Sequence, residues 1–102
     1  MTEEYRDWIN SLKDRAGRAR IQMRIDRLAH GNPGKGRNLT GSVSELKIDF
    51  GPGYRVYYGR DGKAIIILLG GGSKRRQAAD ITAAIDRWKR YKQTKANNGT
   101  DA

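Results

Sequence analysis

The feature that most limits how this chain can fold is an alternation of apolar and polar residues between positions 43 and 59. The segments 43–50 (VSELKIDF) and 53–59 (GYRVYYG) each place an apolar or aromatic residue at every second position. This period of two is typical of strands that bury one face. Because a Gly-Pro-Gly turn separates the segments, we expect an antiparallel hairpin. The residues expected on its buried face are Leu46, Ile48, Phe50, Tyr54, Val56 and Tyr58.

A third strand is predicted in the segment AIIILLGG at 64–71, which is apolar on both faces, as expected for a central or doubly covered strand. Asp61-Gly62 before it is a signal for a two-residue hairpin loop. If that loop forms, Arg60 pairs with Lys63. The resulting register pairs Tyr58 with Ile65, Val56 with Ile67 and Tyr54 with Leu69, and it places Ile66 and Leu68 beside Tyr57 and Arg55.

Helical periodicity precedes and follows these strands. It predicts a helix over 3–14, an interruption at Gly17, a second helix to about residue 29, a loop over 30–38, and a third helix that starts near 74–77 with Ser73 as a candidate cap. We expect an α+β fold of two layers: an N-terminal helical hairpin packed on a small antiparallel sheet, with a C-terminal helix. The single domain should span 1–94, and 95–102 should be a flexible polar tail. The apolar stripes of the helices are Tyr5, Trp8, Ile9, Leu12, Ile21, Ile25, Leu28, Ile81, Ile85 and Trp88.

Composition restricts the possible functions. The chain has no cysteine and one histidine, so we expect no disulfide, no ordinary zinc site and no cofactor. Lys and Arg number 21 against 11 Asp and Glu, and the net charge of +10 suits a polyanionic partner such as nucleic acid or an acidic protein. The acidic N-terminus lacks an apolar signal region and no apolar run is long enough to span a membrane, so a cytoplasmic protein without membrane contact is expected.

Basic residues gather on the second face of the predicted sheet. Lys47, Arg55 and Tyr57 share this face, and the residues after the third strand are Lys74, Arg75 and Arg76. Cations with an aromatic ring suit phosphate neutralisation and base stacking, so these residues are candidates for RNA binding, together with Arg37 of the preceding loop. Two structural alternatives stay open from the pattern alone: Arg55 could pair with Asp49, and Tyr57 could be ordinary strand packing. The stretch GGGSKR (70–75) is a weak phosphate-loop candidate because it lacks the G-K-[ST] ending.

With these motifs in view, the chain resembles the RelE/ParE toxin superfamily, in particular its HigB-like "addiction module killer protein" branch. The resemblance rests on FGPGYRVYYG, DGKAIIILLGGGSKRRQ and DITAAIDRW, with ELKI and a GN loop before them, and it covers residues 3 to about 92. It implies a RelE-like fold and the toxin of a type II toxin-antitoxin system. Such toxins are ribosome-dependent endoribonucleases that cleave messenger RNA by attack of a ribose 2′-hydroxyl on the adjacent phosphate, and so inhibit translation and arrest growth.

The resemblance also assigns residues. Arg55 matches the strand arginine that stabilises phosphate charge, Lys74 (or Arg75) matches the basic residue after the third strand, and Lys47 is a possible general base or orienting group. The family's C-terminal tyrosine or histidine is replaced here by Ala79 and Asp80. Tyr91 is the nearest later aromatic and becomes a catalytic candidate, and Tyr57 could serve from the sheet.

The implied partners are a cognate antitoxin with a helix-turn-helix, messenger RNA and the ribosome, with operator DNA contacted only through the antitoxin complex. Because the acid and base are weakly defined, a ParE-like inhibitor of DNA gyrase without catalysis is the alternative. A third alternative is a subunit of the operator complex that has lost toxicity. The apolar pair Ile66 and Leu68 suggests that the C-terminal helix or an antitoxin segment covers part of the second face.

Overall fold

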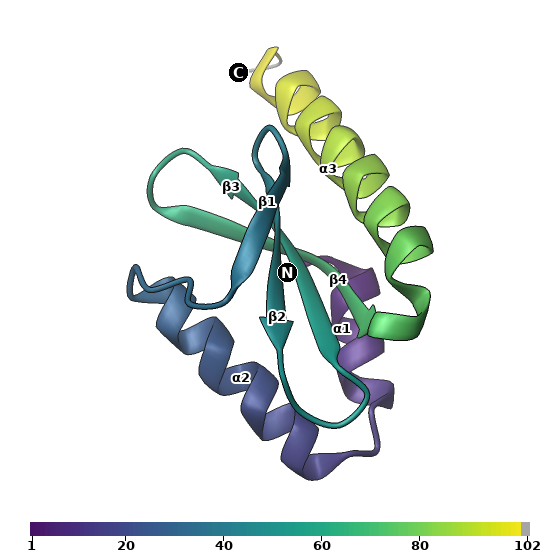
Figure 1. Ribbon diagram of the computed structural model, residues 1–102. Coiled ribbons are helices and arrows are strands. Elements are labelled where there is room, and N and C mark those ends of the chain that lie inside the picture. The colour runs from purple at the N-terminus through teal and green to yellow at the C-terminus, as the bar shows by residue number, and fades with distance from the viewer. Residues whose placement is uncertain (101–102) are drawn as a thin grey trace.

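The computed structural model describes the backbone of residues 1–100 and the side chains of residues 1–96. Its four strands form one antiparallel sheet in the order β1-β2-β3-β4 (Figure 1). The predicted α+β class, with two N-terminal helices, an antiparallel sheet and a C-terminal helix, is confirmed. The elements are α1 (Glu3–Ser11), α2 (Arg15–Ala29), β1 (Gly36–Thr40), β2 (Val43–Ile48), β3 (Tyr54–Asp61), β4 (Ile65–Ser73), the 3-10 turn η1 (Lys74–Arg76) and α3 (Gln77–Thr100).

The two N-terminal helices begin at side-chain caps. Thr2 accepts a hydrogen bond from the Tyr5 N–H, and Asp14 accepts one from the Gly17 N–H at 2.9 Å. The predicted interruption at Gly17 is therefore wrong: the break lies at residues 12–14, and Gly17 belongs to the first turn of α2. A glycine is needed there because a Cβ atom would lie 2.7 Å from the Tyr54 ring.

Helices α1 and α2 cover one face of the sheet, which we call the α1/α2 face. Their predicted apolar stripes meet the alternating residues of β2 and β3 in one core, as the sequence pattern indicated. Burying side chains of this size is the main stabilising term of such a fold. The buried residues of this core are Tyr5, Ile21, Leu28, Leu46, Ile48, Tyr54, Val56 and Tyr58.

Helix α3 packs on the opposite face, which we call the α3 face, so the fold has three layers and the prediction of two is wrong (Figure 1). The predicted stripe of Ile81, Ile85 and Trp88 is confirmed as the packing side of this helix. Helix α3 covers part of this face, which was one of the two expected coverings, but Ile66 and Leu68, on which that expectation rested, lie on the α1/α2 face. The buried residues of this second core are Val43, Tyr57, Leu69, Ala84 and Trp88.

The predicted register between β3 and β4 is wrong. Three residues, 62–64, connect Asp61 to its partner Ile65, and a bulge between Tyr57 and Tyr58 shifts the pairing once more. Tyr58 therefore lies opposite Leu68, and the faces of the apolar run are exchanged relative to the prediction. A run that is apolar on both faces gives no signal for its own register. Ile66 and Leu68 pack into the α1/α2 core, whereas Ile67 and Leu69 pack under α3.

The glycine run at 70–72 is part of strand β4 and not a phosphate loop. A Cβ atom at Gly71 would lie 2.2 Å from the Trp8 ring, and one at Gly72 would lie 2.1 Å from the Asp80 carboxylate. The glycines therefore let α1 and α3 approach the strand from its two faces. Ser73 makes no side-chain cap bond, contrary to the prediction, and η1 intervenes before α3.

Two further segments differ from expectation. Residues 36–40, within and after the predicted loop, form the edge strand β1, which is mostly exposed and carries polar residues that give no apolar alternation. Helix α3 continues to Thr100 through the polar segment expected to be a tail. Residues 101–102 of that tail lie outside the described residues. Within residues 1–100, no helix combines the length and the apolar character needed to cross a membrane.

Candidate functional site

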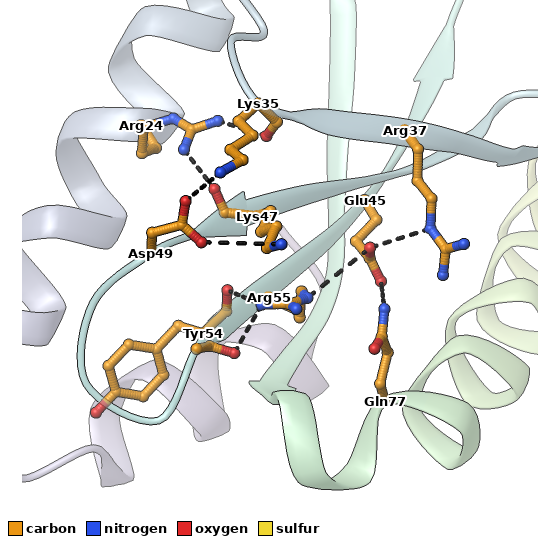
Figure 2. Close-up of polar contacts among 10 residues, drawn as sticks. Arg24, Lys35, Arg37, Glu45, Lys47, Asp49, Tyr54, Arg55 and Gln77 are labelled. Atoms are coloured by element: carbon orange, nitrogen blue, oxygen red, sulfur yellow. Dashed lines mark hydrogen bonds and ion pairs between the residues drawn. The ribbon is translucent and has the colours of Figure 1, made fainter.

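An open pocket of about 430 Å³ lies on the α3 face, between β1, β2, β3 and the first residue of α3. Its lining holds four cations and one carboxylate, so the local charge is strongly positive. Figure 2 shows these side chains converging from neighbouring strands and from the start of α3. We call it the Glu45 pocket, and it is lined by Lys35, Gly36, Arg37, Glu45, Lys47, Arg55 and Gln77.

Lys47 and Arg55 are direct cross-strand partners, as the alternation pattern predicted. Their environments differ, because the Lys47 side chain is 41% exposed whereas that of Arg55 is 4% exposed. The Arg55 Nη1 donates to the carbonyl oxygens of Gly53 at 2.9 Å and Tyr54 at 3.3 Å. Arg55 is thus a fixed part of the pocket wall and not the exposed cation that the sequence suggested.

The partner of Arg55 is Glu45, and the predicted alternative pairing with Asp49 is wrong. The Arg55 Nε lies 3.9 Å from the Glu45 Oε1, and both residues are 3% exposed. The same carboxylate accepts hydrogen bonds from the Arg37 Nε at 3.3 Å and the Gln77 Nε2 at 2.9 Å. A buried carboxylate that accepts two hydrogen bonds and lies 3.9 Å from the Arg55 Nε, which itself has no hydrogen-bond partner among the described residues, is the central group of the pocket (Figure 2).

Glu45 is the main pocket residue that the sequence did not predict. The signal was present, because the alternation placed it on the same face as Lys47 and Arg55. Lys35 was missed for another reason, since it lies in a Gly- and Pro-rich stretch without periodicity. Gln77 carries no charge and gave no signal.

The two lysines of the pocket, Lys35 and Lys47, pair with Asp49, a residue that does not line the pocket. Asp49 binds the Lys35 Nζ at 2.5 Å and lies 3.9 Å from the Lys47 Nζ. The pKa of Asp49 is lowered chiefly by the hydrogen bond from Lys35, with further contributions from the positive charges of Lys35, Lys47 and Arg55. Arg24 of α2 donates to the backbone carbonyls of Lys47 at 2.5 Å and Lys35 at 2.7 Å, which fixes the two segments relative to each other (Figure 2).

The other predicted basic residues lie at the edge of this arrangement. Lys74 is exposed at the start of η1 and its Cβ packs close to Gly53, beside an Arg55 Nη atom. Arg75 and Arg76 follow on the same turn and are also exposed. The structure therefore brings Lys47, Arg55 and Arg37 into one pocket and places Lys74 next to it.

The two predicted tyrosines do not take part in the pocket. Tyr57 is fully buried under α3, so it cannot stack on a base; the packing alternative is the one observed. Burial raises the pKa of its hydroxyl, and the charges of Glu45 and Asp80 raise it further. Tyr91 stacks on Trp88 and donates to the Asp61 Oδ2 at 2.8 Å. Asp61 lies six residues beyond Arg55 along β3, which is about 20 Å of strand.

Chemically, the Glu45 pocket can bind an anion and accept a proton beside it. The exposed cations suit a phosphodiester, and the carboxylate is the group able to take a proton from a hydroxyl. Within the described residues, the pocket lining includes no histidine or tyrosine, and no group of three or more potential metal-ligating side chains occurs. Asp80, one of the two residues at which the sequence resemblance would have placed a tyrosine or histidine, packs against Gly72, and burial raises its pKa.

Comparison with known proteins gives one informative relative. The chain is 40% identical to an uncharacterized protein from Haemophilus influenzae (strain ATCC 51907 / DSM 11121 / KW20 / Rd) over 83 residues, which cover 81% of this chain and 84% of that protein. No family model matches the chain, and no solved structure matches it. The extent and the identity of the match show that this chain belongs to the same protein family as the Haemophilus influenzae protein.

Proposed function

We propose that this protein is a RelE-like toxin of a type II toxin-antitoxin system that cleaves messenger RNA on the ribosome in the cytoplasm. The observation that carries the proposal is the Glu45 pocket, whose lining combines four cations with one buried carboxylate on the α3 face. The sequence resemblance described above supplies the substrate class. The net charge of +10 supports a polyanionic substrate.

In this proposal the scissile phosphate lies against the exposed cations Lys35, Arg37 and Lys47. Their side chains are 62%, 59% and 41% exposed, so they can reach a ligand, whereas Arg55 holds the carboxylate in place. Positive charge at this position stabilises the additional negative charge that develops on the phosphate oxygens during attack.

The reaction requires two proton transfers. The 2′-hydroxyl gives its proton to the Glu45 carboxylate, and its oxygen forms a bond to phosphorus as the bond to the 5′ oxygen breaks. The leaving 5′ oxygen takes a proton from the Lys47 ammonium, which gives a 2′,3′-cyclic phosphate and a 5′-hydroxyl end. Glu45 replaces Lys47 as the candidate base, because a carboxylate accepts hydrogen bonds and protons, whereas an ammonium group offers only donors.

The test is a translation reaction programmed with a defined messenger. Wild-type protein should produce fragments that end in 2′,3′-cyclic phosphate, and Lys47→Gln should reduce the cleavage rate by about 100-fold or more, which is the usual range for losing a proton-transfer group. Lys63→Gln is the matched control, because it removes the same charge from the exposed β3–β4 turn. Intact messenger at a toxin concentration equal to that of the ribosomes would overturn the proposal.

A second candidate is a ParE-like inhibitor of DNA gyrase that acts by binding alone. It is favoured by the absence of histidine and tyrosine from the pocket lining described above. Inhibition of gyrase supercoiling by the purified protein, with messenger left intact, would support this candidate. In both cases we propose a helix-turn-helix antitoxin as the partner, with operator DNA reached only through their complex; co-purification with the product of the neighbouring reading frame tests this.

A further inference from the structure

A second hollow, of about 140 Å³, lies beside the Glu45 pocket, between helix α2 and the end of strand β2. Its floor is apolar and consists of Ile48, Phe50 and Met23, the last of which is 53% exposed. Arginines of α2 form its rim. We call it the Phe50 hollow. It is smaller than the roughly 300–1,000 Å³ of pockets that enclose a drug-sized ligand, so it suits a single planar group.

The Phe50 hollow and the Glu45 pocket have no lining residue in common: the hollow lies on the side of helix α2 and the pocket on the α3 face, and contacts of Lys35 connect them. Asp49 and Arg24 line the hollow, and both bind Lys35, which lines the pocket. Figure 2 shows Arg24, Lys35 and Asp49 together on the side of Lys47 away from Glu45. A chain-like ligand that places one phosphate in the Glu45 pocket can therefore continue past Lys35 into the hollow.

Some charged side chains of the hollow already bind other groups of the protein, and others do not. Asp49 is engaged by Lys35 and Lys47, and Arg24 is engaged by three backbone carbonyls. Arg20 and Arg27 are exposed, and neither takes part in the ion pairs formed by the described side chains. Arg20 and Arg27 can therefore bind a ligand without breaking an ion pair within the protein.

Arg20 is also presented in a particular orientation. Its guanidinium carbon lies 4.7 Å from the centre of the Phe50 ring, so the aromatic ring backs the cation. Guanidinium planes and aromatic rings are the surfaces on which proteins stack the bases of single-stranded RNA. An acidic peptide could pair with the charges of the arginines, but it would not stack on the Arg20 guanidinium.

We propose that the Phe50 hollow is a subsite for a nucleotide beyond the two that flank the cleaved phosphate. The base stacks on the Arg20 guanidinium above Phe50, and Arg27 binds the next phosphate of the strand. This inference rests on the proposed function, because it assumes a single-stranded RNA in the Glu45 pocket. It assigns to α2 a role in holding the substrate and not only in packing.

The test uses the full chain and 2′-O-methyl oligoadenylates of two to five nucleotides, which lack the attacking hydroxyl. Binding is followed by NMR of the backbone amides. The dinucleotide should shift amides of the Glu45 pocket. One of the longer oligonucleotides should bind at least about fivefold more tightly than the oligonucleotide one nucleotide shorter. This is the lower end of the affinity gain from stacking one base, and the same oligonucleotide should also shift amides of residues 20–27.

Arg20→Gln should remove that length-dependent gain and leave the affinity for the dinucleotide within about twofold of wild type. Arg27→Gln should lower the slope of log affinity against log salt concentration by about 0.7, the value for one phosphate contact on a single strand. Arg18→Gln is the matched control, because it removes the same charge from an exposed position of α2 outside the hollow. It should change neither quantity.

The possible failures are distinguishable. If the oligonucleotides bind the Glu45 pocket but the gain with length is absent, or survives in Arg20→Gln, the subsite is refuted and the proposed function stands. If Arg20→Gln weakens only the complex with the antitoxin, the hollow binds protein and the subsite is likewise refuted. If no oligonucleotide shifts the pocket amides, the subsite is refuted, and the RNA-cleaving function is decided separately by the translation reaction.

Discussion

Replacing Glu45 with glutamine should destabilise the protein strongly, because it leaves the buried Arg55 guanidinium without its countercharge. The two charged groups are 3.9 Å apart and both residues are 3% exposed. With an effective dielectric constant of about 20, this separation corresponds to an attraction of about 4 kcal/mol. Breaking a buried pair by removing one partner costs about 3–5 kcal/mol. The lost ion pair between Glu45 and Arg37 adds little to this loss of stability, because the Arg37 side chain is 59% exposed.

We therefore expect Glu45→Gln to lower the free energy of unfolding by about 3 kcal/mol, a large share of the roughly 5–15 kcal/mol typical of a domain. The assay is urea denaturation followed by tryptophan fluorescence at neutral pH. With a denaturant slope of about 1.5 kcal/mol per molar, the midpoint should fall by about 2 M. Asp49→Asn is the control, since its carboxylate pairs with lysines at an exposed position, and its midpoint should change far less.

A double-mutant cycle with Arg55→Met separates the pair from its surroundings. If the pair interacts as described, the double variant should lose less stability than the sum of the two single losses, by up to about 3 kcal/mol. A midpoint in Glu45→Gln that matches wild type, or losses that add within about 0.5 kcal/mol, would refute the reasoning.

Three further predictions test other parts of the structure. The pKa of Asp14 is lowered, first by the hydrogen bond from the Gly17 N–H, so the stability it contributes is present above the ordinary aspartate value of 3.8 and is lost as the pH falls through the lower folded pKa. In Asp14→Asn the free energy of unfolding should decline less steeply below about pH 4, and an unchanged decline would contradict this. Gly59→Ala should cost about 1–3 kcal/mol and alter the near-ultraviolet circular dichroism, because the new methyl group would lie 2.3 Å from the Trp88 ring; a wild-type urea midpoint would count against it. Tyr91→Phe should leave messenger cleavage within about twofold of wild type, because its hydroxyl binds Asp61 about 20 Å along β3 from Arg55; a large loss of rate would return Tyr91 to the catalytic set.

Much of the fold could be predicted because alternation and helical spacing report burial directly. The pairing of Lys47 with Arg55 follows from keeping Leu46, Ile48 and Val56 on one buried face, since a one-residue slip would expose them all. No such constraint acts on β4, where both faces are apolar. A longer turn and a bulge could therefore change its register without changing its hydrophobic pattern.

The clustering of Lys47 and Arg55 was predicted from the sequence, but their pairing with carboxylates was not. Sequence patterns place charged residues on a face, but they do not say which of two carboxylates an arginine meets. Asp49 and Glu45 lie on the same face, on either side of Lys47, and the choice between them depends on where α3 crosses the sheet. The helix leaves its first residue, Gln77, bonded to Glu45, and this draws the carboxylate into the buried end of the pocket.

The position of Glu45 changes the interpretation of Arg55. A guanidinium with 4% exposure that is bonded to two carbonyls cannot move towards a phosphate without breaking those bonds. The more exposed cations are Lys35, Arg37 and Lys47; Glu45 pairs with Arg37, and Asp49 pairs with the two lysines, which offsets their mutual repulsion. Arg55 is therefore best understood as the group that pairs with Glu45 at the strand, and the proposed function assigns the substrate to the exposed cations. On this basis a change at Arg37 should weaken RNA binding in a folded protein, whereas a change at Arg55 should reduce stability and activity together.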